Sequence, residues 1–166
     1  LICFNLSSEF YPLTYILLIV ASALLPFIIF NMAPNPKVKI FLGDGGSLFL
    51  GYIISWALIY SAENINNFTP SFALWCVAIP LFDFLTVIIM RIVRKQSLMI
   101  ARKDHIHHCL ENLGFSKQII LLLTVSSGLA ILLIGSFIEN YFPALSFSVF
   151  LTLFLLYLFI RMYNKS

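Results

Sequence analysis

A single aspartate, Asp44, stands among glycines in the stretch FLGDGGS at residues 41–47. Glycine accepts positive φ angles without steric penalty, so this stretch lets the backbone bend tightly and approach a ligand closely. A carboxylate there, near Lys37 and Lys39, suits a divalent ion that bridges phosphate oxygens. The alternative is an Asp-Gly turn in which Ser47 caps the following helix. The Walker pattern GxxxxGK(S/T) is absent, so a P-loop is not indicated.

A second cluster consists of imidazoles, because three histidines lie within four residues: His105, His107 and His108. Arg102 and Lys103 shortly precede them and make the stretch cationic and rich in hydrogen-bond donors. Imidazole N–H groups and cations can share the charge of a bound diphosphate. Two alternatives stay open: a solvated loop whose bases only fix topology, and a zinc site that includes Cys109. Positions 107, 108 and 109 cannot all face one ion on a regular helix, which weighs against zinc.

Asp83 is an ionisable residue inside the apolar stretch IPLFDF. A charged group within a membrane helix is costly, and it therefore indicates either a functional site or a pairing with a polar group of a neighbouring helix. Pro80 lies three residues earlier and is expected to kink this helix.

Long apolar runs must position these residues, and they cover roughly 13–32, 47–62, 71–90, 119–138 and 141–160. A helix of about 20 residues crosses the ~30 Å hydrocarbon core of a bilayer. The chain is 61% hydrophobic and 10% charged, with a mean hydropathy of +0.99, which excludes an ordinary soluble domain. We expect an all-α, polytopic transmembrane helical bundle with about five membrane helices, in which residues 1–166 are part of one domain.

The ten Lys and Arg residues occupy three short polar stretches, which five crossings would place on one side of the membrane. The positive-inside rule then predicts cytosolic loops at about 33–46 and 91–117, so the candidate site faces the cytosol. The net charge of +3 is a topology signal and does not indicate nucleic-acid binding. The three cysteines show no CxxC spacing and are expected to be unpaired.

Three segments carry a family resemblance: KIFLGDGGSLFLG, ALWCVAIPLFD and RKDHIHHCLENLGFS. In order and spacing they resemble the C-terminal half of the polyprenyl-phosphate N-acetylhexosamine-1-phosphate transferases, which are glycosyltransferase family 4 enzymes. The motif HIHH favours the branch that transfers GlcNAc-1-phosphate to undecaprenyl phosphate. Such enzymes initiate O-antigen, common-antigen or other cell-envelope polysaccharide synthesis at the bacterial inner membrane.

The resemblance implies that undecaprenyl phosphate attacks UDP-GlcNAc and releases UMP, with Mg²⁺ as cofactor and Mn²⁺ as an alternative. It implies that Asp44 and His105 are catalytic, with Asp44 as the metal ligand. Phe41 would stack on uracil, and Asn31 would lie near the phosphates. The substrate-binding residues that we predict are Phe41, Asn31, Lys103, His107, His108 and Asp83.

Two features depart from the family pattern. Relatives carry Asp-Arg before the histidine motif, whereas this chain has Arg102 and Lys103, so the bidentate guanidinium fork is only partly replaced. The family's N-terminal acidic segments have no equivalent here, and we expect a fragment that is inactive alone. A homodimer is expected by analogy. The alternative function is a membrane transporter segment with a cytosolic, His-rich metal site.

Overall fold

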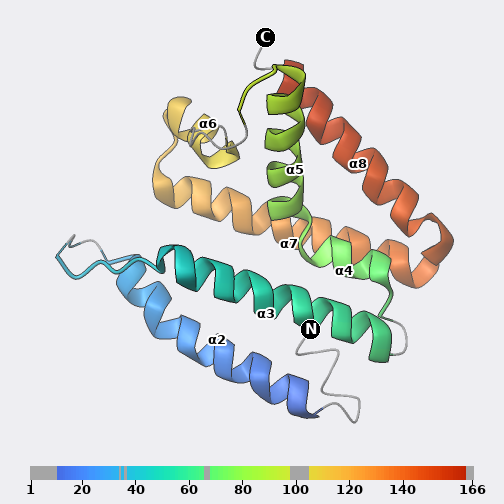
Figure 1. Cartoon of the computed structure of the whole chain (residues 1–166), viewed down its shortest axis with the longest axis horizontal. Coiled ribbons are helices and arrows are strands. Elements are labelled where there is room, and N and C mark those ends of the chain that lie inside the picture. The colour runs from blue at the N-terminus through green and yellow to red at the C-terminus, as the bar shows by residue number, and fades with distance from the viewer. Residues whose placement is uncertain (1–10, 34, 36, 66–67, 98–104, 164–166) are drawn as a thin grey trace. The chain divides into compact units, whose positions relative to one another are not determined.

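The computed structural model describes residues 11–33, 35, 37–65, 68–97 and 105–163. Within these ranges the chain forms α-helices and no strand, which confirms the predicted all-α class. The chain divides into two compact units, residues 1–70 and 71–166, and each is described by itself (Figure 1).

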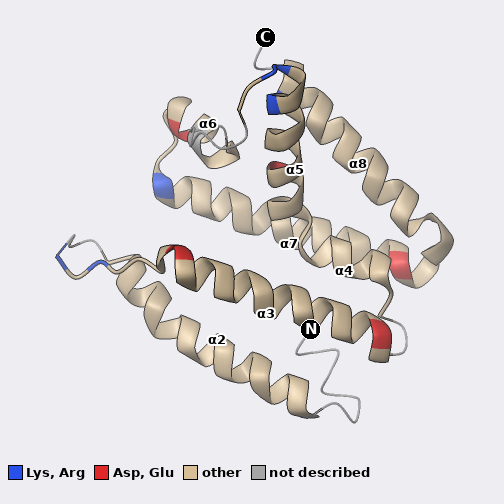
Figure 2. Cartoon of the chain, viewed as in Figure 1, with Lys and Arg blue, Asp and Glu red and all other residues tan. Residues whose placement is uncertain are grey.

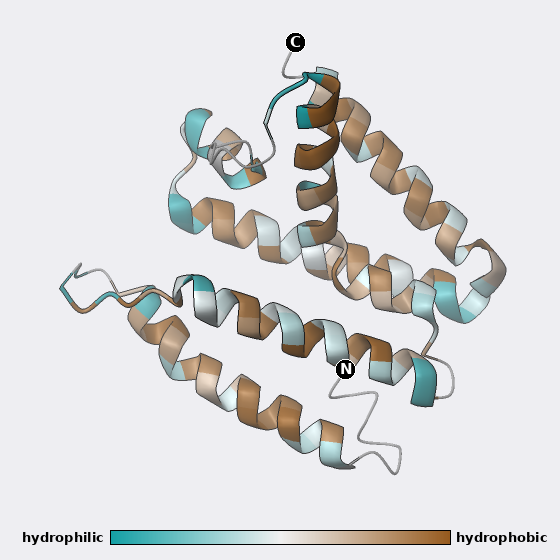
Figure 3. Ribbon diagram, in the orientation of Figure 1, coloured by the Kyte–Doolittle hydropathy of each residue, from teal (hydrophilic) through white to brown (hydrophobic). Residues whose placement is uncertain are grey.

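The described residues of the first unit form two long apolar helices, α2 (Tyr11–Asn31) and α3 (Gly43–Asn64). Both helices are apolar on nearly all sides, which is typical of helices surrounded by lipid (Figure 3). The expected run at 47–62 is extended at both ends, so α3 has 22 residues and is long enough to cross a bilayer.

The second unit contains five helices within its described residues: α4 (Pro70–Cys76), α5 (Ala78–Val93), α6 (Ile106–Asn112), α7 (Lys117–Tyr141) and α8 (Pro143–Tyr163). Helices α5, α7 and α8 pack against one another, and the short α6 packs on α7 (Figure 1). Aromatic side chains form the core: the rings of Trp75 and Phe82 lie 5.2 and 5.0 Å from that of Phe150. The Trp75 indole N–H donates to the Ser146 hydroxyl at 3.0 Å, so its polar atom is satisfied inside this core.

The kink expected near Pro80 is a sharp break in the run at 71–90, where α4 and α5 meet at an angle of 83° around Val77. Pro80 supplies the physical reason. It has no N–H to donate to the Cys76 carbonyl four residues earlier, and its ring excludes that carbonyl from a helical position. A new helix therefore begins at Ala78, which places Pro80 in its first turn, where a missing N–H is tolerated.

In the part of the chain that the structure describes, four helices are long and apolar enough to span a membrane: Pro12–Asn31, Gly43–Asn64, Lys117–Tyr141 and Pro143–Tyr163. The bent pair α4 and α5 brings the total to five if it counts as one span. The described part of the chain thus agrees with the expected polytopic membrane protein. Figure 2 shows basic residues at the C-terminal end of α5 and an acidic residue near the C-terminal end of α7.

Candidate active site

The Asp83 carboxylate links α5 to the residues that carry the histidine motif. One oxygen, Oδ2, lies 2.8 Å from His105 Nδ1, and the other, Oδ1, accepts the Ile106 backbone N–H at 2.9 Å. Because an ionised carboxylate can only accept, Nδ1 carries the proton of this bond and Nε2 remains for other contacts. His105 and α6 together are called the histidine segment below.

The burial of Asp83 makes this link strong. The residue is 9% exposed, whereas the imidazole of His105 is 42% exposed. Hydrogen bonds to a charged, poorly solvated acceptor contribute about 1.5–3 kcal/mol each. The carboxylate therefore orients the ring from its buried side and leaves the other side open to a ligand.

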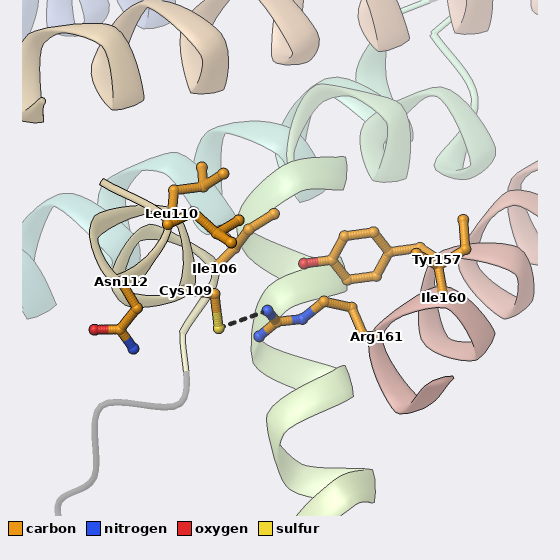
Figure 4. A pocket seen from close by; sticks show the side chains of 8 residues that line it. Ile106, Cys109, Leu110, Asn112, Tyr157, Ile160 and Arg161 are labelled. Carbon is orange, nitrogen blue, oxygen red and sulfur yellow. Dashed lines mark hydrogen bonds between the residues drawn. The ribbon is translucent and has the colours of Figure 1, made fainter. Parts of the chain in front are cut away.

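Helix α8 contributes two further polar side chains to the same place. The Tyr157 hydroxyl lies 3.5 Å from Asp83 Oδ1, at the outer limit of a hydrogen bond, and Arg161 Nη2 lies 3.8 Å from the same oxygen. Arg161 Nη1 also donates to Cys109 Sγ at 2.9 Å (Figure 4). Tyr157 and Arg161 are four residues apart and so occupy one face of α8.

His107 lies beside His105, with the two rings nearly parallel and their centroids 5.8 Å apart. His107 is exposed, so both imidazoles are accessible to solvent. His108 belongs to α6, while Lys103 and Arg102 lie outside the described residues. The structure thus brings His105, His107 and Asp83 together, as a shared ligand would require.

The zinc alternative receives no support within the described residues. No three His, Cys, Asp or Glu side chains converge there in a way that would hold a metal. Cys109, the thiol that such a site would use, is instead engaged by the Arg161 guanidinium. Zinc normally requires four convergent N, S or O ligands.

In the first unit, the loop between α2 and α3 brings the other candidate residues to one end of these helices. The Asn31 amide donates to the Ile40 carbonyl at 2.9 Å and so ties residues 40 and 41 to the end of α2. Phe41 is 78% exposed, and Lys39 Nζ lies 5.9 Å from the centre of its ring. This ring is free to stack on a planar ligand, as the predicted contact with uracil requires.

Asp44 lies in the first turn of α3 and is exposed. The turn begins at Gly43, whose φ of +69° is strained for residues with a side chain. Ser47 does not cap this helix, because its hydroxyl donates to the Gly43 carbonyl at 2.9 Å from inside the helix. The alternative of a Ser-capped Asp-Gly turn is therefore wrong.

The surroundings of Asp44 fit a hydrated magnesium ion that carries a phosphate. A side chain at Gly43 or Gly45 would meet nothing within 4 Å, so there is room for a ligand on both sides of the carboxylate. Mg²⁺ usually takes only one or two protein carboxylates and completes its shell with water and substrate phosphate. Helix N-termini favour phosphate groups through their free N–H groups. Asp44 would hold the ion, and the α3 N-terminus would face the phosphate.

The sequence alone did not identify the roles of Arg161 and Tyr157. The sequence predicts for Arg161 only a place among the ten bases that fix topology, whereas its side chain is 11% exposed and directed inward. The sequence feature that indicates them is the four-residue spacing of Tyr157 and Arg161 in a mostly apolar helix. Asp44 and His105 lie in different units, so their shared ligand stays a prediction.

Residues 1–62 match the sequence profile of glycosyl transferase family 4. Undecaprenyl-phosphate alpha-N-acetylglucosaminyl 1-phosphate transferase of Haemophilus influenzae is 35% identical over 109 residues, which are 63% of this chain and 31% of that protein. The enzymes of the same name from Yersinia pestis and Escherichia coli K12 are 30% identical over 141 residues and 33% identical over 111 residues.

These two matches cover 82% and 65% of this chain, and 39% and 30% of the respective enzymes. The chain thus spans about a third of the length of the curated relatives that it matches. No solved structure matches it. These relatives and the match of residues 1–62 to the glycosyl transferase family 4 profile confirm the resemblance carried by the three motifs.

Proposed function

We propose that the protein carrying this chain transfers GlcNAc-1-phosphate from UDP-GlcNAc to undecaprenyl phosphate. A phosphate oxygen of the lipid attacks the sugar-bearing β-phosphorus, the α–β phosphoanhydride bond breaks, and UMP leaves with that bond's electron pair. The product is undecaprenyl-diphospho-GlcNAc, which would initiate a cell-envelope polysaccharide such as O-antigen or common antigen. The names of the three relatives support this reaction class.

The observation that carries the proposal is the Asp83–His105 bond of 2.8 Å. It fixes an exposed imidazole beside α5, and Arg91 lies about two helical turns further along the same helix. Phosphoryl transfer needs alignment and charge stabilisation more than covalent chemistry, so oriented donors next to a diphosphate are effective. His105 and His107 would contact the diphosphate, while Asp83 holds His105 in place.

Asp44 would hold Mg²⁺ in the same reaction, and the bound ion would supply screening of the diphosphate charge. Phe41 would stack on the uracil, and Asn31 would fix the loop that carries Phe41 through its bond to Ile40. These roles require that the loop of the first unit and the histidine segment of the second bind one nucleotide.

The lipid acceptor fits the apolar character of the chain, since membrane-spanning helices present lipid-facing surface on most sides. The bases at the C-terminal end of α5 favour a location of the site on the cytosolic side of a bacterial inner membrane. UDP-sugars are available on that side. A multi-pass membrane protein with its active face toward the cytosol is thus part of the proposal.

Asp44→Asn tests the proposal in membranes that contain the protein carrying this sequence. UMP release from UDP-GlcNAc and undecaprenyl phosphate should fall at least 100-fold, because an amide does not replace the anionic ligand of Mg²⁺. Removing divalent ions with EDTA should abolish release, and adding Mg²⁺ should restore it in the wild type only. The matched control is Glu63→Gln, an exposed carboxylate at the other end of α3, which should keep normal turnover. Normal release by the Asp44→Asn protein would remove Asp44 from the metal site.

A further inference from the structure

Arg161 occupies an unusual place for a basic residue at the end of a membrane helix. It lies in the last turn of α8, where Arg side chains normally extend outward to the interface. Its side chain is instead 11% exposed and directed into the second unit. Burying a guanidinium is costly unless specific partners compensate, so this orientation indicates contacts that stabilise it.

Those contacts connect three helices. Nη1 donates to Cys109 Sγ of α6 at 2.9 Å, and Nη2 stands 3.8 Å from Oδ1 of Asp83 in α5 (Figure 4). The planar guanidinium presents its donors in a fixed fork, so one side chain engages both groups. The same Asp83 oxygen accepts the first backbone N–H of α6. Arg161 thus contacts both the histidine segment and the carboxylate that holds it.

Apolar packing alone does not hold the histidine segment against α8. Between them lies a pocket of about 610 Å³, lined on one side by Ile106, Leu110 and Leu113 and on the other by Tyr157 and Ile160. The pocket opens to the surroundings and separates these side chains, so few direct apolar contacts join α6 to α8. A helix of seven residues is also unstable by itself in water. The polar link through Arg161 therefore has a large share in fixing α6 relative to α8.

We propose that Arg161 is a positioning residue for the histidine segment. It acts through Cys109 and Asp83 and does not itself touch the nucleotide, and the inference rests on the proposed transferase function. Helix α8 is then part of the active site, because the Arg161 guanidinium keeps His105 and His107 in position to contact the diphosphate. Tyr157, one turn earlier on the same face, completes the polar contacts around Asp83.

The test compares Arg161→Met, which keeps an unbranched apolar stem, with Arg161→Lys, which keeps the charge but loses the fork. In the Met variant, kcat for UMP release should fall 10- to 100-fold while KM for UDP-GlcNAc changes less than threefold, because alignment is lost and binding is kept. The Lys variant should recover part of the loss. The control is Lys117→Met at the exposed start of α7, which should keep both constants.

Hydrogen–deuterium exchange of the same proteins gives a measurement that does not depend on activity. In the Met variant, amides of residues 106–112 should exchange about tenfold faster, while amides of α7 stay unchanged, since only the link to α6 is removed. Cys109→Ala should produce the same local change, and combining it with Arg161→Met should add little. Cys109→Ser, which keeps an acceptor, should resemble the wild type.

Unchanged protection of residues 106–112 in Arg161→Met would overturn the proposal, whether or not the transferase reaction is confirmed. So would faster exchange with an unaltered kcat, because α8 would then hold α6 without serving the reaction. A wild-type protein that releases no UMP would instead refute the proposed function and the role inferred for Arg161 in it. The exchange data would still report whether Arg161 holds α6 in place. Parallel loss of α7 protection would indicate global unfolding, and the Lys variant would then decide the outcome.

Discussion

Asp83→Asn would replace the carboxylate that holds the histidine segment by an amide of the same shape. The amide oxygen can still accept the Ile106 N–H, which lies 2.9 Å from Oδ1, but an NH₂ group would then face His105 Nδ1 at the position of Oδ2. Nδ1 would then have to accept from this NH₂ group, which moves the imidazole proton to Nε2, and a charge-assisted hydrogen bond of about 2 kcal/mol would be lost. Arg161, 3.8 Å away, would lose its counter-charge, which adds about 1 kcal/mol after solvent screening.

The sum of about 3 kcal/mol corresponds to a shift of about 100-fold in the docking of the histidine segment, since 1.4 kcal/mol is a factor of ten. We expect kcat for UMP release to fall 10- to 100-fold, because displaced imidazoles no longer meet the diphosphate. Steady-state UMP release and thermal stability in detergent would be measured on the same preparations. Glu63→Gln, at an exposed carboxylate of α3, serves as the control for loss of a negative charge.

A double-mutant cycle with His105→Ala separates this link from general destabilisation. If Asp83 acts through His105, the double variant should be little worse than His105→Ala alone, with a coupling free energy of about 2 kcal/mol. Strictly additive losses in kcat would refute the reasoning. So would an Asp83→Asn protein whose kcat lies within twofold of the wild type.

Three further outcomes are expected. Gly135→Ala should destabilise the protein by about 1–3 kcal/mol in thermal unfolding, because the added Cβ collides with the Trp75 ring. Gly128→Ala, where the nearest atom is 3.7 Å from the added Cβ, should be tolerated. Equal melting temperatures of the two variants would contradict the packing of α7 on α4. Phe41→Ala should raise KM for UDP-GlcNAc about tenfold without loss of stability, since the ring is 78% exposed, and an unchanged KM would exclude stacking on uracil. In a protein without the other cysteines, Cys109 should react with an impermeant maleimide in inside-out vesicles and not in spheroplasts. Labelling in spheroplasts only would show that the topology is opposite to the one predicted.

The sequence predicted the helices well because their formation depends on local composition. In a bilayer every backbone N–H and C=O must be satisfied within its own segment, so a long apolar run has little choice but to be helical. Pro80 predicts a kink, but the size of the break at Val77, 83°, depends on how α4 and α5 pack. Asp44 and His105 were singled out because such groups next to apolar runs are uncommon.

The partners of the polar residues were decided by the tertiary structure. Asp83 contacts His105 and Ile106, 22 and 23 residues later, and Arg161 contacts Cys109, 52 residues away. Hydropathy does not predict these pairings, because an apolar side chain is equally stable against lipid and against another helix. The buried and the lipid-facing sides of a membrane helix therefore differ little in composition. The sequence determined which segments cross the membrane and which carry chemistry, whereas helix packing alone decided that α8 supports the histidine segment.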